Sequence, residues 1–166
     1  MTKRIIVLVA ALLALLVPPV AAPTPAAAAL DSGGDVFVFG DAAFHGSLAD
    51  TRVQDRIVAI VPTPSGKGYW LAGADGGVFS FGDAKFRGST GSIRLNQPIV
   101  AMAATPSGNG YWMVARDGGI FAFGDAKFYG SRGAAGVSAP IVDMARTPAG
   151  KGYWMVASNG TVYGFS

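Results

Sequence analysis

One sequence recurs in this chain at a fixed interval. Gly-Tyr-Trp stands at residues 68–70, 110–112 and 152–154, and Gly-Asp-Ala stands at residues 40–42, 82–84 and 124–126. Both motifs return after 42 residues. A fixed period of this length is typical of stacked repeats, because a single repeat cannot bury its hydrophobic face alone. Residues shared by every copy are therefore expected to serve the fold, and residues that differ between copies are free to serve a ligand.

The first 29 residues have the features of a secretory signal peptide. Lys3 and Arg4 precede an apolar run, 5–17, that is too short to span a bilayer, and the small residues 27–29 offer a cleavage site. The prediction is a secreted protein, extracellular or associated with the cell wall. Its β-repeat domain covers residues 30–166 and keeps no membrane span after cleavage. An uncleaved membrane anchor is the alternative.

Composition excludes several classes of function. Loss of Lys3 and Arg4 with the signal peptide lowers the net charge from +3 to +1, and no basic stripe remains, so nucleic acid is not an expected partner. The chain has no Cys and no Glu, and His45 is its only histidine. Closely spaced Asp residues with ligand-like neighbours are also absent from the sequence. The sequence therefore predicts no enzyme, no metal and no cofactor.

Each full repeat contains four short strand-like pieces. In one copy these are residues 99–105, 111–115, 120–123 and 127–130. Asp-Gly between the second and third pieces predicts a two-residue type I′ hairpin turn, in which both central residues have positive φ. The turn pairs are Asp75-Gly76, Asp117-Gly118 and Asn159-Gly160. Helical periodicity is absent after residue 30, so the fold class is all-β.

Aromatic residues indicate how the repeats pack. Of the 18 aromatic residues, all but Tyr129 stand at positions that recur from copy to copy, Phe44, Phe86 and Phe128 included. Tyr111 and Trp112 are adjacent, so they face opposite sides of a strand. Each copy can thus bury aromatic side chains on both faces of a small sheet, which suits sheets sandwiched between neighbours.

The number of copies leaves the closure of the fold open. Residues 57–98 and 99–140 are full copies, while residues 33–56 and 141–166 are partial ones. About three four-stranded units of this length predict a partial, open β-propeller, since propellers generally need at least four blades. Threefold closure like that of a β-trefoil is the alternative, followed by an open β-fan or solenoid. Open sheet edges also predict a homo-oligomer.

Residues 110–131, Gly-Tyr-Trp-Met-Val-Ala-Arg-Asp-Gly-Gly-Ile-Phe-Ala-Phe-Gly-Asp-Ala-Lys-Phe-Tyr-Gly-Ser, resemble a tandem repeat of secreted actinobacterial proteins. That repeat often accompanies cell-wall-active or other exported domains. The layout is also similar to that of tachylectin-like propeller lectins, which bind amino sugars between their blades. The resemblance implies a β-repeat module at the cell envelope.

Candidate site residues follow from comparing the copies. His45, Arg87 and Tyr129 occupy one position that differs in each copy, and Lys85 and Lys127 precede two of them. Trp70, Trp112 and Trp154 recur and could stack on a sugar ring, or could pack between sheets. The recurring Asp41, Asp83 and Asp125, like Asp75, Asp117 and Asn159, are predicted to hold turns through side-chain hydrogen bonds.

These observations predict a secreted, non-catalytic binding module, most plausibly for a glycan or cell-wall polymer. Repeated weak sites gain avidity on a polymer. The alternative is a structural or protein-interaction module, or a piece of a larger exported repeat protein. Exposed tryptophans in grooves would favour the first function, and buried tryptophans would favour the second.

Overall fold

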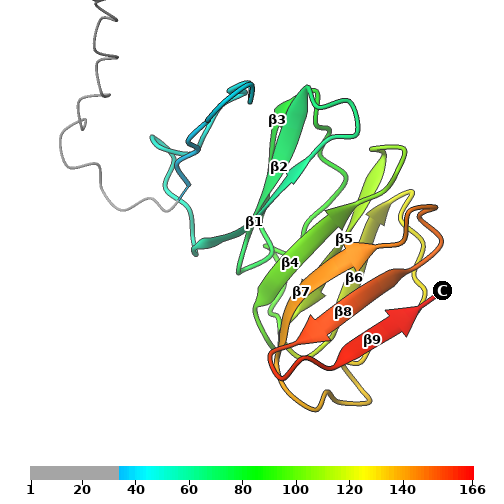
Figure 1. The fold of residues 1–166 in the computed structure, drawn as a ribbon. Coiled ribbons are helices and arrows are strands. Elements are labelled where there is room, and N and C mark those ends of the chain that lie inside the picture. The colour runs from blue at the N-terminus through cyan, green and yellow to red at the C-terminus, as the bar shows by residue number, and fades with distance from the viewer. Residues whose placement is uncertain (1–33) are drawn as a thin grey trace, which may run out of the picture.

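The computed structural model describes residues 34–166, so the predicted signal peptide at residues 1–29 lies outside the described part (Figure 1). The described chain forms three antiparallel sheets of three strands each, and it contains no helix. The first sheet comprises β1 (Ile57–Pro62), β2 (Gly68–Gly73) and β3 (Val78–Gly82); the second comprises β4 (Ile99–Ala104), β5 (Gly110–Ala115) and β6 (Ile120–Gly124); the third comprises β7 (Ile141–Arg146), β8 (Tyr153–Ala157) and β9 (Val162–Phe165).

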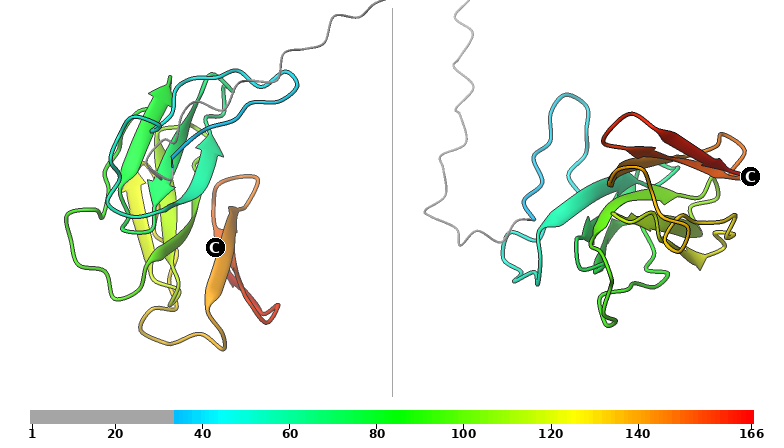
Figure 2. Two further views of the ribbon diagram at one scale, coloured as in Figure 1. Left: turned by 90° about the vertical axis from the view of Figure 1, so that its left-hand side faces the viewer. Right: turned by 90° about the horizontal axis from the view of Figure 1, so that it is seen from below.

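The three sheets are stacked in chain order and do not close. Figure 2 shows the third sheet, orange to red, at one end of the stack, and β4 contacts both β1 and β7. β9 pairs only with β8, and residues 34–56 form no strand. Threefold closure, which the sequence left as an alternative, is therefore wrong for the described residues. Within them, no helix has the length and hydropathy to cross a bilayer.

Each sheet has three strands rather than the four expected. The fourth piece of the repeat, residues 127–130 in one copy, lies outside the regular strands. Its backbone instead takes part in hydrogen bonds with tyrosine and tryptophan side chains, described below. The prediction of four-stranded repeats is therefore not confirmed, although the segment recurs with the repeat.

The turn between the second and third strands differs from the prediction. Among the described residues, only glycines have positive φ, so Asp75 and Asp117 do not adopt a type I′ turn. Gly76 has φ 82°, and its N–H donates to the Gly73 carbonyl at 2.9 Å. This is a three-residue loop whose last residue, the glycine, is left-handed. The aspartate carboxylate accepts a hydrogen bond from the backbone N–H two residues further on. This hydrogen bond, rather than a positive φ of the aspartate, explains why Asp stands at this position.

Apolar side chains fill the spaces between successive sheets. Tyr111 belongs to the cluster between the first and second sheets, and Trp112 belongs to the cluster between the second and third. The two residues therefore face opposite sides of β5, as the sequence predicted. A third cluster, around Leu48, Tyr69 and Leu71, joins the N-terminal residues to the first sheet. These clusters pack the sheets against one another. Disulfide bonds make no contribution, because the chain contains no cysteine.

Candidate functional site: the outer segments of the repeats

A short piece of chain follows β3 and β6, and residues 41–46 stand at the same repeat position before the first sheet. We call residues 41–46, 83–88 and 125–130 the outer segments. Trp70 Nε1 donates to the Lys85 carbonyl at 3.0 Å, within one repeat. The Tyr111 hydroxyl, in the next repeat, donates to the Gly88 carbonyl at 2.6 Å. One outer segment thus bonds to the tryptophan of its own sheet and to the tyrosine of the sheet that follows.

The same bonds recur at the neighbouring outer segment. Trp112 Nε1 donates to the Lys127 carbonyl at 2.7 Å, and the Tyr153 hydroxyl donates to the Gly130 carbonyl at 2.6 Å. Rings pack alongside these bonds, with Trp112 and Tyr153 centroids 5.7 Å apart. A repeated tyrosine-and-tryptophan clamp therefore fixes the outer segments at residues 83–88 and 125–130, whereas residues 41–46 are bonded by Tyr69 alone.

The glycine that ends each outer segment is required by its backbone and its surroundings. Gly88 has φ 132°, and a Cβ built there would lie 2.4 Å from the Phe123 ring. Gly46 and Gly130 have the same conformation and face Phe81 and Phe165 in the same way. Only glycine lets the segment approach the ring of the next sheet this closely.

Asp83 and Asp125 start their outer segments and hold the turn between the first two strands of their own sheet. Asp83 Oδ1 accepts from Thr63 Oγ1 at 2.8 Å, and Asp83 Oδ2 accepts from Ser65 Oγ at 2.5 Å. Asp125 makes the equivalent bonds with Thr105 and Ser107. The partners stand 18 and 20 residues earlier, so the carboxylate fastens a neighbouring turn rather than its own. The hydrogen bonds from Ser65 and Thr63 lower the pKa of Asp83.

The position that varies between copies, His45, Arg87 or Tyr129, lies in the outer segments. Arg87 Nη2 donates to Asn109 Oδ1 at 2.5 Å, and the Tyr129 hydroxyl donates to the Gly150 carbonyl at 3.2 Å. The His45 ring packs against Tyr69 with centroids 5.6 Å apart. Each of the three side chains therefore reaches the following repeat. They bridge sheets and also present polar groups at the surface.

Sequence reasoning missed the most exposed aromatic residues of this edge. Phe44, Phe86 and Phe128 recur in every outer segment, and their exposed fractions are 57%, 59% and 61%. Their recurrence alone predicts that they serve the fold rather than a ligand. Packing within the described chain does not account for a large apolar side chain at this place in all three segments. The sequence signal for their exposure was that a phenylalanine immediately precedes the variable residue in all three copies.

The three tryptophans are in two different environments. Trp70 and Trp112 are 0% and 1% exposed, whereas Trp154 is 44% exposed. Trp70 and Trp112 are covered by an outer segment and by the tyrosine of the following sheet, and within residues 34–166 nothing equivalent covers Trp154. Trp70 and Trp112 therefore cannot stack on a sugar ring in this structure, because both side chains are buried.

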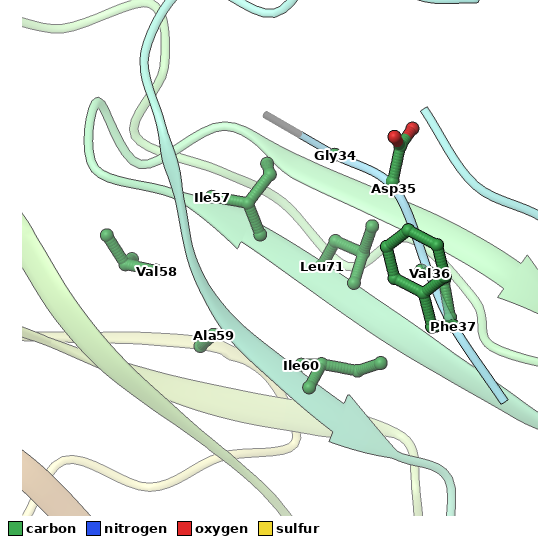
Figure 3. A pocket seen from close by; sticks show the side chains of 9 residues that line it. All are labelled: Gly34, Asp35, Val36, Phe37, Ile57, Val58, Ala59, Ile60 and Leu71. Atoms are coloured by element: carbon green, nitrogen blue, oxygen red, sulfur yellow. The ribbon is translucent and has the colours of Figure 1, made fainter. Parts of the chain in front are cut away.

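The two ends of the stack carry exposed apolar side chains. At one end, Ile60 is 55% exposed, although the residues at the same repeat position, Met102 and Met144, are 6% and 7% exposed. Here residues 34–37 and β1 line an open groove of about 370 Å³, with Leu71 at its floor (Figure 3). At the other end, Val142, Trp154 and Val162 are exposed. We call these the N-terminal face and the C-terminal face.

Within residues 34–166, no three His, Cys, Asp or Glu side chains come together as a metal site. The remaining turn residue, Asn159, accepts a hydrogen bond from Thr161 N at 3.1 Å, like the aspartates at its repeat position. Asp41, Lys85 and Lys127 lie at the surface of the outer segments.

Comparisons with known proteins give one distant structural similarity. No family model matches the sequence, and no curated protein matches it. Among solved structures, the chain is similar to hydrazine synthase of Kuenenia stuttgartiensis, with 15% identity and a TM-score of 0.43. The similarity covers 65% of this chain and 32% of that chain, so this chain spans about a third of the other protein. A likeness this distant indicates neither activity nor ligand.

Proposed function

We propose that this chain is a secreted, non-catalytic binding module for a glycan of the cell envelope or extracellular space. The observation that carries the proposal is the row formed by Phe44, Phe86 and Phe128. Each ring is more than half exposed and is followed in the sequence by a residue that can form hydrogen bonds, namely His45, Arg87 or Tyr129. An apolar ring next to polar donors suits the two surfaces of a sugar ring.

The ligand contacts move accordingly from the tryptophans to the outer segments. Lys85 and Lys127 add positive charge beside two of the three rings. A polymer with repeated units can engage several outer segments of one chain, and repeated weak contacts multiply into avidity. An oligosaccharide that spans a single ring is expected to bind much more weakly than the polymer.

The architecture that supports this function is an open arc of propeller-like blades. Successive sheets pack face to face, with β1, β4 and β7 adjacent, and each third strand leads to an outer segment in the place of a fourth strand. Blades of about 40 residues are the usual size in propellers. Export through the signal peptide at residues 1–29 completes the proposal.

Retention on insoluble peptidoglycan tests the proposed function. The folded chain should be retained, and the double variant F86A/F128A should lose most of that retention, because two of the three rings are gone. Ile93→Ala is the matched control, since Ile93 is also exposed (55%) but lies away from the outer segments. Folded protein that binds neither peptidoglycan nor any member of a glycan array would refute the proposal.

A structural or protein-interaction module is the second candidate function. Complete burial of Trp70 and Trp112 favours it, because these tryptophans join sheets rather than face a ligand. Here the exposed faces at the two ends of the stack, rather than the row of phenylalanines, would be the functional surfaces. Substitutions in the row would leave this function unchanged.

A further inference from the structure

The two internal junctions, between the first and second sheets and between the second and third, show which groups cover the face of a sheet. At the two internal junctions the tryptophan of one sheet lies under the outer segment of its own repeat and against the tyrosine of the next sheet. Trp70 and Tyr111 centroids are 5.7 Å apart, as are those of Trp112 and Tyr153. The isoleucine that begins the following sheet, Ile99 or Ile141, is then almost completely buried.

The C-terminal face matches the first half of such a junction, except that the exposed Asp143 stands at the repeat position of the buried Ala101, and no second half covers it in the described chain. Trp154 has the same place in β8 as Trp70 has in β2, yet it is 44% exposed. Val142 and Val162 are exposed around it. Within residues 34–166, the Trp154 indole N–H forms no hydrogen bond that corresponds to those of Trp70 with Lys85 and Trp112 with Lys127.

The N-terminal face is the second half of a junction without its first half. Ile60 is exposed and Ile57 is partly exposed, although Ile99 and Ile141, at the repeat position of Ile57, are buried. The groove of about 370 Å³ lies where a preceding sheet would pack (Figure 3). The outer segment at residues 41–46 is already seated here, since the Tyr69 hydroxyl donates to the Gly46 carbonyl.

We propose that two copies of this chain join head to tail through these faces. By the repeat positions, the Trp154 indole N–H of one copy donates to the Ala43 carbonyl of the second copy. The Trp154 ring then packs against Tyr69 of the second copy, as Trp70 packs against Tyr111. Thr147 gains Asp41 of the second copy as acceptor, by analogy with Thr105 and Asp125. This inference rests on the second candidate function and is independent of glycan binding.

The junction requires an exchange of one strand. Residues 36–40 of the second copy have the same repeat position as residues 162–166, which include β9. Both cannot occupy the place beside β8, so we assign it to residues 36–40 of the second copy. Phe37 and Phe39 are exposed and pair with no strand in the single chain. β9 carries Gly164 at the position of Val38, and a glycine weakens a strand, so the incoming strand is the better partner for β8.

Complementation between two variants tests the head-to-tail arrangement. Trp154→Arg spoils the C-terminal face alone, and Phe39→Asp spoils the N-terminal face alone. Both residues are exposed in the single chain, so both variants should fold. In sedimentation velocity without glycan, the full chain should associate and each variant should stay monomeric. An equal mixture of the two variants should form a complex of two chains, because a heterologous interface still has one intact face of each kind.

Cysteine pairing tests the exchanged strand, because the chain has no cysteine of its own. In β8 and β9, Val156 pairs with Val162, so Val36 of the second copy should take that place. Mixed V36C and V156C proteins should form a disulfide-linked pair at a rate well above that of V36C mixed with the exposed control I93C. Equal rates would overturn the strand exchange.

Two results would overturn the proposal as a whole. One is a full chain that stays monomeric up to its solubility limit. The other is association that survives both Trp154→Arg and Phe39→Asp. Neither result bears on glycan retention, which is measured on the outer segments with different variants. Failure of the head-to-tail junction and failure of glycan binding are therefore separable.

Discussion

Single hydroxyl groups join the repeats of this protein. The Tyr111 hydroxyl donates to the Gly88 carbonyl and accepts from Arg87 N at 3.0 Å, and Tyr153 and Tyr69 do the same at their junctions. A hydroxyl that both donates and accepts leaves two backbone groups unpaired when it is removed. These tyrosines therefore matter more than their ring packing alone would indicate.

Tyr111→Phe should lower the free energy of unfolding by about 1–3 kcal/mol, the usual cost of leaving buried polar groups without partners. Urea denaturation measures the change. Tyr163→Phe is the control, because the Tyr163 hydroxyl bonds at the exposed surface to Ser138. An equal loss in the two variants would contradict the assigned role.

Burial also makes the junction tyrosines sensitive to alkali. Burial raises the pKa of Tyr111 and of Tyr153 above 10.0, the ordinary value. The neutral phenol is thus favoured in the fold, so its contribution to stability is fully present below pH 10 and is lost as the pH rises through the folded-state pKa. Denaturation measured from pH 9 upward should show stability falling above about pH 10. The fall should be shallower in Y111F, and an identical fall in both proteins would contradict the prediction.

Thr90 offers a stabilising substitution. It is buried, and its hydroxyl has no hydrogen-bond partner, while the same repeat position in the first partial repeat holds Leu48. Thr90→Val keeps the shape and removes the unpaired hydroxyl, so stability should rise by about 1 kcal/mol. Thermal unfolding measures the change. A lower midpoint would show that the hydroxyl is satisfied in solution.

Outer segments are the elements on which the stack depends, although they are not strands. The segments at residues 83–88 and 125–130 each pass between the tryptophan of one sheet and the tyrosine of the next, and the final glycine of each lies against a phenylalanine ring. The element is thus held by side chains from two sheets rather than by a β-ladder. This explains why a repeat with four strand-like pieces yields only three strands.

Gly88→Ala should destabilise the junction between the first and second sheets. The new Cβ would lie 2.4 Å from the Phe123 ring. The alanine backbone would also have to adopt a φ of 132°, which L-residues rarely adopt. We expect a loss of about 2 kcal/mol or more, from backbone strain and overpacking together. Gly66→Ala is the matched control, because Gly66 has φ 70° with nothing within 4 Å of a built Cβ. Equal losses in urea denaturation would mean that the ring contact is unimportant.

The whole molecule behaves as a row of units in which each sheet contacts only its neighbours. β4 contacts β1 and β7. In the described chain, no strand of the first sheet packs extensively against a strand of the third sheet. Stability in such a row is approximately the sum of unit and junction terms. The molecule should therefore tolerate a change in the number of its units.

Removal of residues 99–140 should leave a folded, shorter stack. The deletion joins residue 98 to residue 141 and so replaces the first junction by one of the same kind, since Ile99 and Ile141 begin equivalent strands. Circular dichroism should retain the β signal, and the denaturant m-value should fall in proportion to the surface lost. An unfolded product would show that the three sheets depend on one another beyond their neighbours.

The sequence by itself determined the repeat, the all-β class, three of the four strand-like pieces in each full repeat and the positions of the turns, because these depend on local composition and on a period that is visible along the chain. The structure corrected the Asp-Gly turn, since the carboxylate bonds to the backbone two residues on and only the glycine needs positive φ. It also decided which recurring aromatics are exposed. Trp70, Trp112 and Trp154 stand in nearly the same local sequence, yet two are buried and one is not. Exposure depends on whether a neighbouring sheet and an outer segment lie over the ring, and only the tertiary structure contains that information.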